Sequence, residues 1–114
     1  MNIKDLIKQQ EEFDSNFKGN FKWNEKINDE NIELLNFLLI ALMGEVGETS
    51  NLIKKVNRGD YKLRDIEEDL SEEIVDILIY TLKMIYQLDI DIEQAYIKKM
   101  DKNKERFKKF LKEE

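Results

Sequence analysis

The chain contains no histidine, no cysteine and no proline, and only 4 of its 114 residues are glycine. The absence of histidine excludes Ser-His-Asp triads, imidazole general bases, HExxH zinc sites and the Glu-x-x-His sites of di-iron bundles. The absence of cysteine excludes disulfides and thiolate chemistry. Any metal site must therefore be built from oxygen ligands, which bind hard cations such as Mg²⁺, Mn²⁺ or Ca²⁺.

The chain also has little positive charge and no long apolar run. Its 19 Lys and Arg residues against 25 Asp and Glu residues give a formal net charge of −6. Such a charge disfavours non-specific nucleic-acid binding, which needs a basic face. The longest apolar run, residues 34–43, is interrupted by Asn36 and is too short to span a bilayer. The first residues lack the apolar run of a signal peptide. We therefore expect a soluble, cytoplasmic protein that binds neither nucleic acid nor membrane.

A composition rich in Leu, Ile, Lys and Glu, without proline, is typical of long helices joined by short connections. The spacing of apolar residues predicts four helices, over residues 3–17, 31–58, 65–87 and 91–111. Gly59 is expected to end the second helix, and Asp91, followed by Gln94, to cap the fourth. One long polar connection, residues 17–30, joins the first two helices, and long loops in compact domains are often binding elements.

These elements predict an all-α, four-helix bundle-like domain that occupies residues 1–114. The second and third helices are expected to pack antiparallel as its central pair. Both are apolar on more than one side, notably between residues 34 and 40. A helix that is apolar all round needs more cover than three neighbouring helices provide. We therefore expect a homo-oligomer, either a dimer or a tetramer.

Two acidic pairs lie inside the two most apolar segments of the chain. Glu45 and Glu48 belong to the second predicted helix, and Glu73 and Asp76 belong to the third. Residues three apart share one face of a helix, and the other residues of these two faces are mostly apolar. We therefore expect the faces to be buried together with their carboxylates. Ionised groups are costly to bury unpaired, and a divalent cation held between the two helices would compensate four such acids.

Two glycines flank the first acidic pair within its predicted helix. Gly44 and Gly47 should each cost about 1 kcal/mol relative to alanine in a helix interior. The expected reason is either a close approach of a neighbouring helix or space for a ligand.

The two acidic pairs and the segment that follows them resemble a known protein family. The chain resembles the MazG-like nucleotide pyrophosphohydrolases of the all-α NTP pyrophosphatase superfamily, in the signature GEVGE and EEIVD and in the downstream segment LDIDIEQAYIKKMDKNKERF. The resemblance covers residues 39–107 and implies an enzyme that uses Mg²⁺, or Mn²⁺ in its place. Its substrate would be a nucleoside triphosphate, NTP or dNTP, cleaved to the monophosphate and pyrophosphate in nucleotide-pool house-cleaning. The metal ligands would be Glu45, Glu48, Glu73 and Asp76. Because histidine is absent, Glu45 or Glu48 is the candidate catalytic base.

Two aromatic residues are candidates for substrate binding. Trp23, with Phe21 in the long connection, is a candidate aromatic lid, because a lone tryptophan in a polar loop has no obvious core. Tyr80 lies one turn beyond Asp76 on the same face, so it borders the acidic site. It either packs in the core or stacks on a base, and stacking tolerates any base.

Four cationic or polar residues are candidates for contact with the phosphates. Lys55 lies among cations near the end of its helix, where they suit the helix dipole, and one of these cations is a candidate phosphate ligand. Lys99, Asn103 and Arg106 share one stripe of the fourth helix, which is otherwise an exposed charged face. By the resemblance, Lys99 and Asn103 are phosphate or metal-shell candidates, and Arg106 is a phosphate clamp or part of a salt bridge.

Two other functions stay open from the sequence. One is a non-catalytic helical oligomerisation or regulatory module with a vestigial metal site, although the intact acidic quartet argues against it. The other is a helical bundle whose carboxylates bind only structural Ca²⁺. Pyrophosphate release, measured with Mg²⁺ and with a chelator, separates the enzyme from both.

Overall fold

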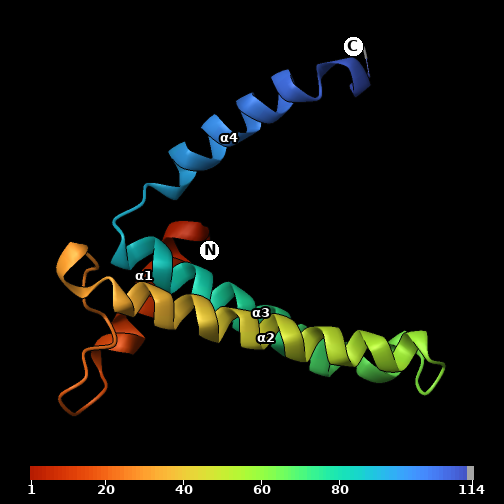
Figure 1. The fold of residues 1–114 in the computed structure, drawn as a ribbon, viewed down its shortest axis with the longest axis horizontal. Coiled ribbons are helices and arrows are strands. Elements are labelled where there is room, and N and C mark those ends of the chain that lie inside the picture. Colours follow the sequence, from red (N-terminus) through yellow and green to blue (C-terminus); the bar gives the residue numbers. More distant parts are fainter. Residues whose placement is uncertain (113–114) are drawn as a thin grey trace.

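The computed structural model describes residues 1–112, and every regular element in that range is helical (Figure 1). The predicted all-α content is therefore confirmed, while the last two residues of the expected domain lie outside the described range. Two short 3₁₀ turns, Asp29–Asn31 and Lys108–Phe110, accompany the α-helices. The helices are α1 (Ile3–Ser15), α2 (Glu33–Asn57), α3 (Leu63–Gln87) and α4 (Ile92–Arg106).

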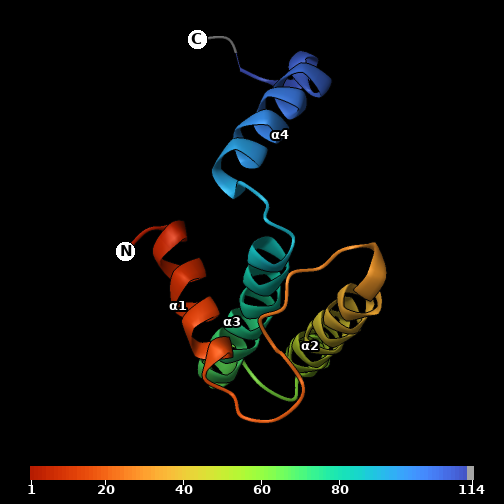
Figure 2. The same ribbon diagram turned by 90° about the vertical axis from the view of Figure 1, so that its left-hand side faces the viewer.

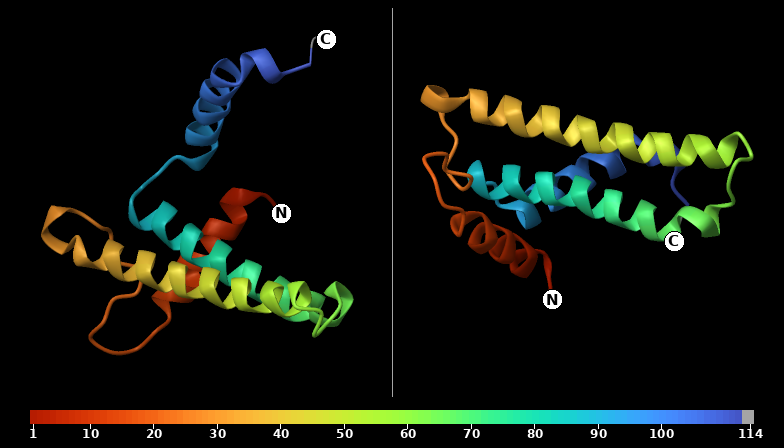
Figure 3. Two further views of the ribbon diagram at one scale, coloured as in Figure 1. Left: turned by 45° about the vertical axis from the view of Figure 1, so that its right-hand side comes forward. Right: turned by 90° about the horizontal axis from the view of Figure 1, so that it is seen from below.

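The helices α2 and α3 form an antiparallel hairpin, and α1 packs on α3 (Figures 2 and 3). The predicted antiparallel central pair is thus present. A short turn joins the two helices, and Gly59 within it adopts the left-handed conformation, with φ of 84°, that glycine takes without strain. The core follows these helix contacts and contains the buried apolar side chains Leu38, Ile66, Leu82, Ile85 and Tyr86.

The long connection between α1 and α2 folds back onto the C-terminal end of α3. The backbone N–H of Ile27 donates to the carbonyl of Gln87 at 2.8 Å. The ammonium of Lys26 donates to the carbonyl of Tyr86 at 2.6 Å and lies 3.1 Å from the carboxylate of Asp89. Because the last carbonyls of a helix have no partner within it, these contacts also cap α3.

Helix α4 does not close a four-helix bundle within this chain. Asp89, with φ of 54°, turns the backbone out of α3, and α4 then projects away from α1, α2 and α3 (Figures 1 and 2). The Asp91 side chain accepts from the N–H of Gln94 at 3.3 Å, as expected of the cap. The α-helix ends at Arg106, earlier than the predicted boundary. No residue of α4 is buried among the described residues, and its apolar side chain Ile97 is 52% exposed.

No helix within residues 1–112 is both long enough and apolar enough to cross a membrane.

Candidate functional site

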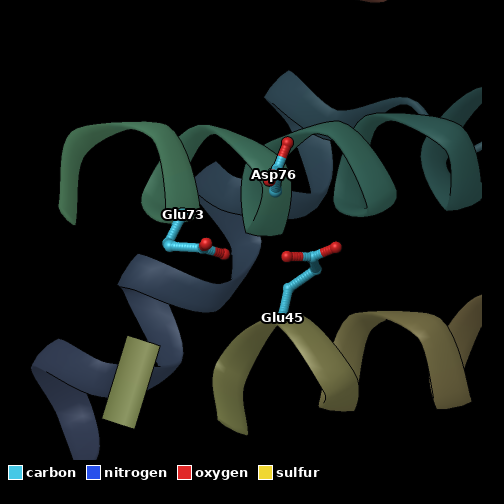
Figure 4. A group of neighbouring side chains, drawn as sticks. All are labelled: Glu45, Glu73 and Asp76. Atoms are coloured by element: carbon cyan, nitrogen blue, oxygen red, sulfur yellow. The ribbon is translucent and has the colours of Figure 1, made fainter. Parts of the chain in front are cut away.

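Three of the four predicted acids converge between α2 and α3 (Figure 4). Glu45 points from α2 toward Glu73 and Asp76 on α3, and one carboxylate oxygen of each lies within 4.8 Å of the other two. All three side chains are half-buried. Oxygen ligands sit about 2.1 Å from Mg²⁺ and up to about 2.6 Å from Ca²⁺, so two ligands of one ion are at most about 4.2 Å apart for Mg²⁺ and about 5.2 Å for Ca²⁺. The three carboxylates are therefore close enough together to hold a single hard cation.

Two oxygens of this cluster are buried without a partner. Glu45 Oε2 and Glu73 Oε2 are inaccessible to solvent, and neither makes a hydrogen bond. A buried acceptor without a donor is unfavourable, and such groups in native proteins have a specific cause. A bound cation would satisfy both oxygens at once.

The pKa values of Glu45 and Glu73 are both raised in this cluster. Burial, together with the neighbouring carboxyl groups of Glu45 and Glu48, raises the pKa of Glu73 to about 7. Burial also raises the pKa of Glu45, and the charges of Glu48 and Asp76 act in the same direction. The neighbouring carboxyl group of Glu73 opposes this rise for Glu45. The cluster therefore holds a proton near neutral pH unless a cation replaces it.

Glu48, the fourth predicted acid, lies at the edge of the cluster. Its side chain is exposed, and it is not one of the three converging carboxylates. Its charge nevertheless raises the pKa of both Glu45 and Glu73, which places it close to them. The arrangement is thus three converging carboxylates with a fourth at the solvent-facing rim.

The close helix approach expected at Gly44 and Gly47 is absent within this chain. A Cβ atom added at either glycine would meet nothing within 4 Å among the described residues. The hairpin partner α3 therefore does not explain these two positions, since the glycines face away from it.

The raised pKa of Glu73 predicts a pH-dependent stability. Between its ordinary pKa of 4.5 and about 7, the folded protein binds more protons at Glu73 than the unfolded chain does. The free energy of unfolding should therefore fall as pH rises through this window in buffer containing EDTA. Urea denaturation at pH 5 and pH 8 measures the change, and Glu73→Gln should remove this contribution. An identical pH dependence in wild type and Glu73→Gln would contradict the prediction.

Two of the predicted substrate-binding residues, Tyr80 and Trp23, are aromatic. Tyr80 is half-buried; burial raises its pKa, and the charges of Glu45 and Asp76 raise it further. Trp23 packs against Phe21 at a centroid distance of 4.6 Å, within a cluster that also includes Phe17 and Phe37. The prediction that Tyr80 borders the acidic site is consistent with this electrostatic coupling.

The remaining predicted residues are not gathered at the carboxylates. Lys55 is exposed near the end of α2, beyond the acidic pair. Lys99, Asn103 and Arg106 lie on α4, which projects away from the hairpin, so the single chain does not bring them to the cluster (Figure 1). Arg106 instead places its guanidinium 5.1 Å from the ring centroid of Phe107. Their roles in substrate binding stay predictions.

A buried polar network centred on Asp14 is a feature that the sequence-based expectations do not include. Asp14 on α1 is 2% exposed and contacts Lys83 and Tyr86 of α3. Two signals in the sequence point to it. Lys83 is the only cation in residues 73–88 and lies seven positions beyond Asp76, on the same helical face. Asp14 lies seven positions beyond Ile7 and so continues the apolar face of α1.

Comparison with known proteins gives one family and several relatives. The model of the MazG nucleotide pyrophosphohydrolase domain matches residues 35–111. Mouse (Mus musculus) dCTP pyrophosphatase 1 is 38% identical over 74 residues, which cover 61% of this chain and 44% of the relative. The human (Homo sapiens) protein of that name is 35% identical over 75 residues, with coverage of 61% and 44%. Gene 37 protein of Mycobacterium phage L5 is 29% identical over 82 residues, covering 68% and 72%.

The match spans less than half the length of each mammalian relative. No solved structure shows significant similarity to the chain.

Proposed function

The chain belongs to the MazG nucleotide pyrophosphohydrolase domain family, and from this premise we propose that it hydrolyses a nucleoside triphosphate to the monophosphate and pyrophosphate with Mg²⁺. The observation that carries the proposal is the convergence of Glu45, Glu73 and Asp76, with two buried oxygens that lack partners. The mammalian relatives are named dCTP pyrophosphatases, so a pyrimidine deoxynucleoside triphosphate is the first substrate class to test.

The converging carboxylates would hold the cation, with Glu48 close to it at the rim. When bound, Mg²⁺ would neutralise part of the triphosphate charge and polarise a phosphoryl oxygen. The carboxylates of α2 and α3 would fix its place on the hairpin. Mn²⁺ prefers the same oxygen ligands and would be a working substitute.

Glu48 is our candidate for the general base. It is exposed to solvent yet close enough to Glu45 and Glu73 to raise their pKa values, so it can reach a water molecule at the edge of the cluster. That water would attack a phosphorus of the α–β anhydride and pass its proton to the Glu48 carboxylate. The bond between the attacked phosphorus and the bridging oxygen would break, which gives the monophosphate and pyrophosphate.

We also propose that the chain forms one domain over residues 1–114 and works as a homo-oligomer. Large apolar side chains on all four α-helices are exposed in the single chain, and contiguous exposed apolar surface marks interaction sites. Examples are Ile40 at 64%, Ile74 at 53% and Tyr96 at 64% exposure. Assembly would cover these faces and could bring the cationic stripe of α4 to an acidic cluster. Light scattering should give a mass of at least two chains, and a monomer at micromolar concentration would contradict the proposal.

The function is tested by incubating the purified chain with a panel of ribo- and deoxyribonucleoside triphosphates and Mg²⁺. Equal amounts of monophosphate and pyrophosphate are expected from at least one pyrimidine substrate. Release of inorganic phosphate instead would indicate cleavage at the terminal phosphate and would contradict the proposed reaction. Thermal stabilisation by Ca²⁺ without turnover of any nucleotide would favour a structural cation site.

A further inference from the structure

A buried ion pair joins α1 to α3 beside the acidic cluster. The Asp14 side chain is fully buried and lies 3.3 Å from the ammonium of Lys83, whose side chain is 12% exposed. Asp14 also accepts hydrogen bonds from the amide of Gln10, at 3.0 Å, and from the hydroxyl of Tyr86. A buried carboxylate needs such a full set of partners, because leaving it unpaired is strongly destabilising.

The pair places the Lys83 ammonium against two aromatic rings. The Nζ atom lies 5.6 Å from the ring centroid of Trp23 and 5.5 Å from that of Tyr80. A cation within about 6 Å of a ring face is attracted to it. A lysine stem is flexible, so the contact with Asp14 is what holds the ammonium between the rings. Tyr80, in turn, is close enough to Glu45 and Asp76 to be affected by their charges.

The same network holds the loop that carries Trp23. The carbonyl of Trp23 accepts from Gln87 Nε2 at 2.6 Å, and its oxygen lies 3.5 Å from the hydroxyl oxygen of Tyr86. The hydroxyl of Tyr86 donates its single proton to Asp14. Asp14 is therefore linked to Trp23 in two ways, through Tyr86 to its backbone and through Lys83 to its ring.

We propose that Asp14 is a positioning residue for nucleotide binding, which acts through Lys83 and Tyr86 to hold Trp23 and Tyr80 beside the carboxylate cluster. This inference rests on the proposed function, because it takes Trp23 and Tyr80 as the aromatic residues that bind the substrate at the same site. Asp14 itself is too deeply buried to touch a substrate. Its effect is on the geometry of the two rings, so it should alter substrate affinity while the acidic cluster keeps its ability to hold a cation.

The test compares Asp14→Asn, Lys83→Met and Lys83→Arg with wild type, with Glu12→Gln as the control for loss of an exposed acid on α1. Asp14→Asn and Lys83→Met should raise KM for the best substrate of the panel about tenfold and change kcat less than about threefold. Lys83→Arg keeps the ion pair, so its KM should stay within about threefold of wild type. Glu12→Gln should behave as wild type.

Trp23 is the only tryptophan, so its fluorescence reports the position of the loop directly. Acrylamide quenching of Trp23 should increase about twofold in Asp14→Asn and Lys83→Met, since a released loop is more accessible. Mn²⁺ affinity, measured by calorimetry, should stay unchanged. A folded Asp14→Asn protein with wild-type KM and wild-type quenching would overturn the proposal. A loss of kcat alone, in proportion to the unfolded fraction, would also overturn it, because that is the behaviour of a merely structural residue.

Two further experiments address a variant that fails to fold and a wild-type protein that cleaves no triphosphate. If a single variant fails to fold, the double variant Asp14→Asn/Lys83→Met leaves neither charge unpaired, and it should show the same raised KM and quenching. If wild type cleaves no triphosphate, the proposed function fails, whereas the positioning of Trp23 is still tested. Quenching of Trp23 by dCTP with Mg²⁺ would then be compared between wild type and Asp14→Asn, and equal titrations would overturn the inference.

Discussion

Glu45→Gln is expected to lower turnover of the nucleoside triphosphate by about 10²-fold or more. Residues that merely support a metal ligand typically cost about 10–100-fold in metal affinity or activity when mutated, and a ligand itself should cost at least as much. Glu45 is the sole contribution of α2 to the three converging carboxylates, so no neighbour on that helix replaces it in the cluster. Steady-state release of pyrophosphate at saturating Mg²⁺ measures the loss.

Glu45→Gln should lose activity without losing thermal stability in the absence of metal. Burial and the neighbouring acids raise the pKa of Glu45, so its charged form is disfavoured in the folded protein without metal. A glutamine at this position carries no charge and can donate a hydrogen bond to Glu73. The melting temperature in EDTA at pH 8 should therefore be at least that of wild type. Asp69→Asn, an exposed acid on α3, is the matched control and should keep full activity. Wild-type turnover by Glu45→Gln would contradict the assignment.

Removal of divalent cations is expected to abolish turnover and to lower the melting temperature. A ligand at about 100 times its Kd stabilises the folded state by about 2.7 kcal/mol, which is roughly 10 °C for a domain of this size. Differential scanning fluorimetry with EDTA, and then with excess Mg²⁺ or Mn²⁺, measures the shift, and pyrophosphate release measures recovery.

The stabilising effect should depend on the cluster itself. In Glu73→Gln the same Mg²⁺ titration should give a much smaller shift, because one of the three carboxylates is lost and its buried oxygen with it. An equal shift in wild type and in Glu73→Gln would place the cation elsewhere on this acidic protein. Full activity in EDTA would contradict a metal-dependent reaction outright.

Much of the fold and part of the site could be predicted because both depend on local rules. Helix periodicity placed the acidic pairs on two faces, and a short turn at Gly59 made those helices antiparallel neighbours. The convergence of Glu45 with Glu73 and Asp76 follows from these two facts. The rim position of Glu48 does not, because it depends on how the two helices are rotated about their axes.

Helix periodicity and capping signals predict neither where α4 lies nor which residues contact Asp14. An amphipathic α4 is predicted equally well whether its apolar side packs on its own chain or on another surface, and the structure shows that it leaves the hairpin. Asp14 continues the apolar face of α1 in the sequence, but the side chains that meet it are known only once α1 is placed on α3. Its burial is a tertiary effect, in which Lys83 and Tyr86 supply partners from a distant segment.

The carboxylate cluster is contained in one helical hairpin, and this has a consequence for the order of folding. Helices α2 and α3 are consecutive, so closing the loop between them costs little entropy, and such local contacts form early in folding. The carboxylate cluster can therefore form before α1 packs on α3 and before the apolar side chains of α4 are buried. A cation present at that stage would screen the repulsion between the two helices as they meet. Magnesium would then assist the chain in reaching its structure as well as serve the finished protein.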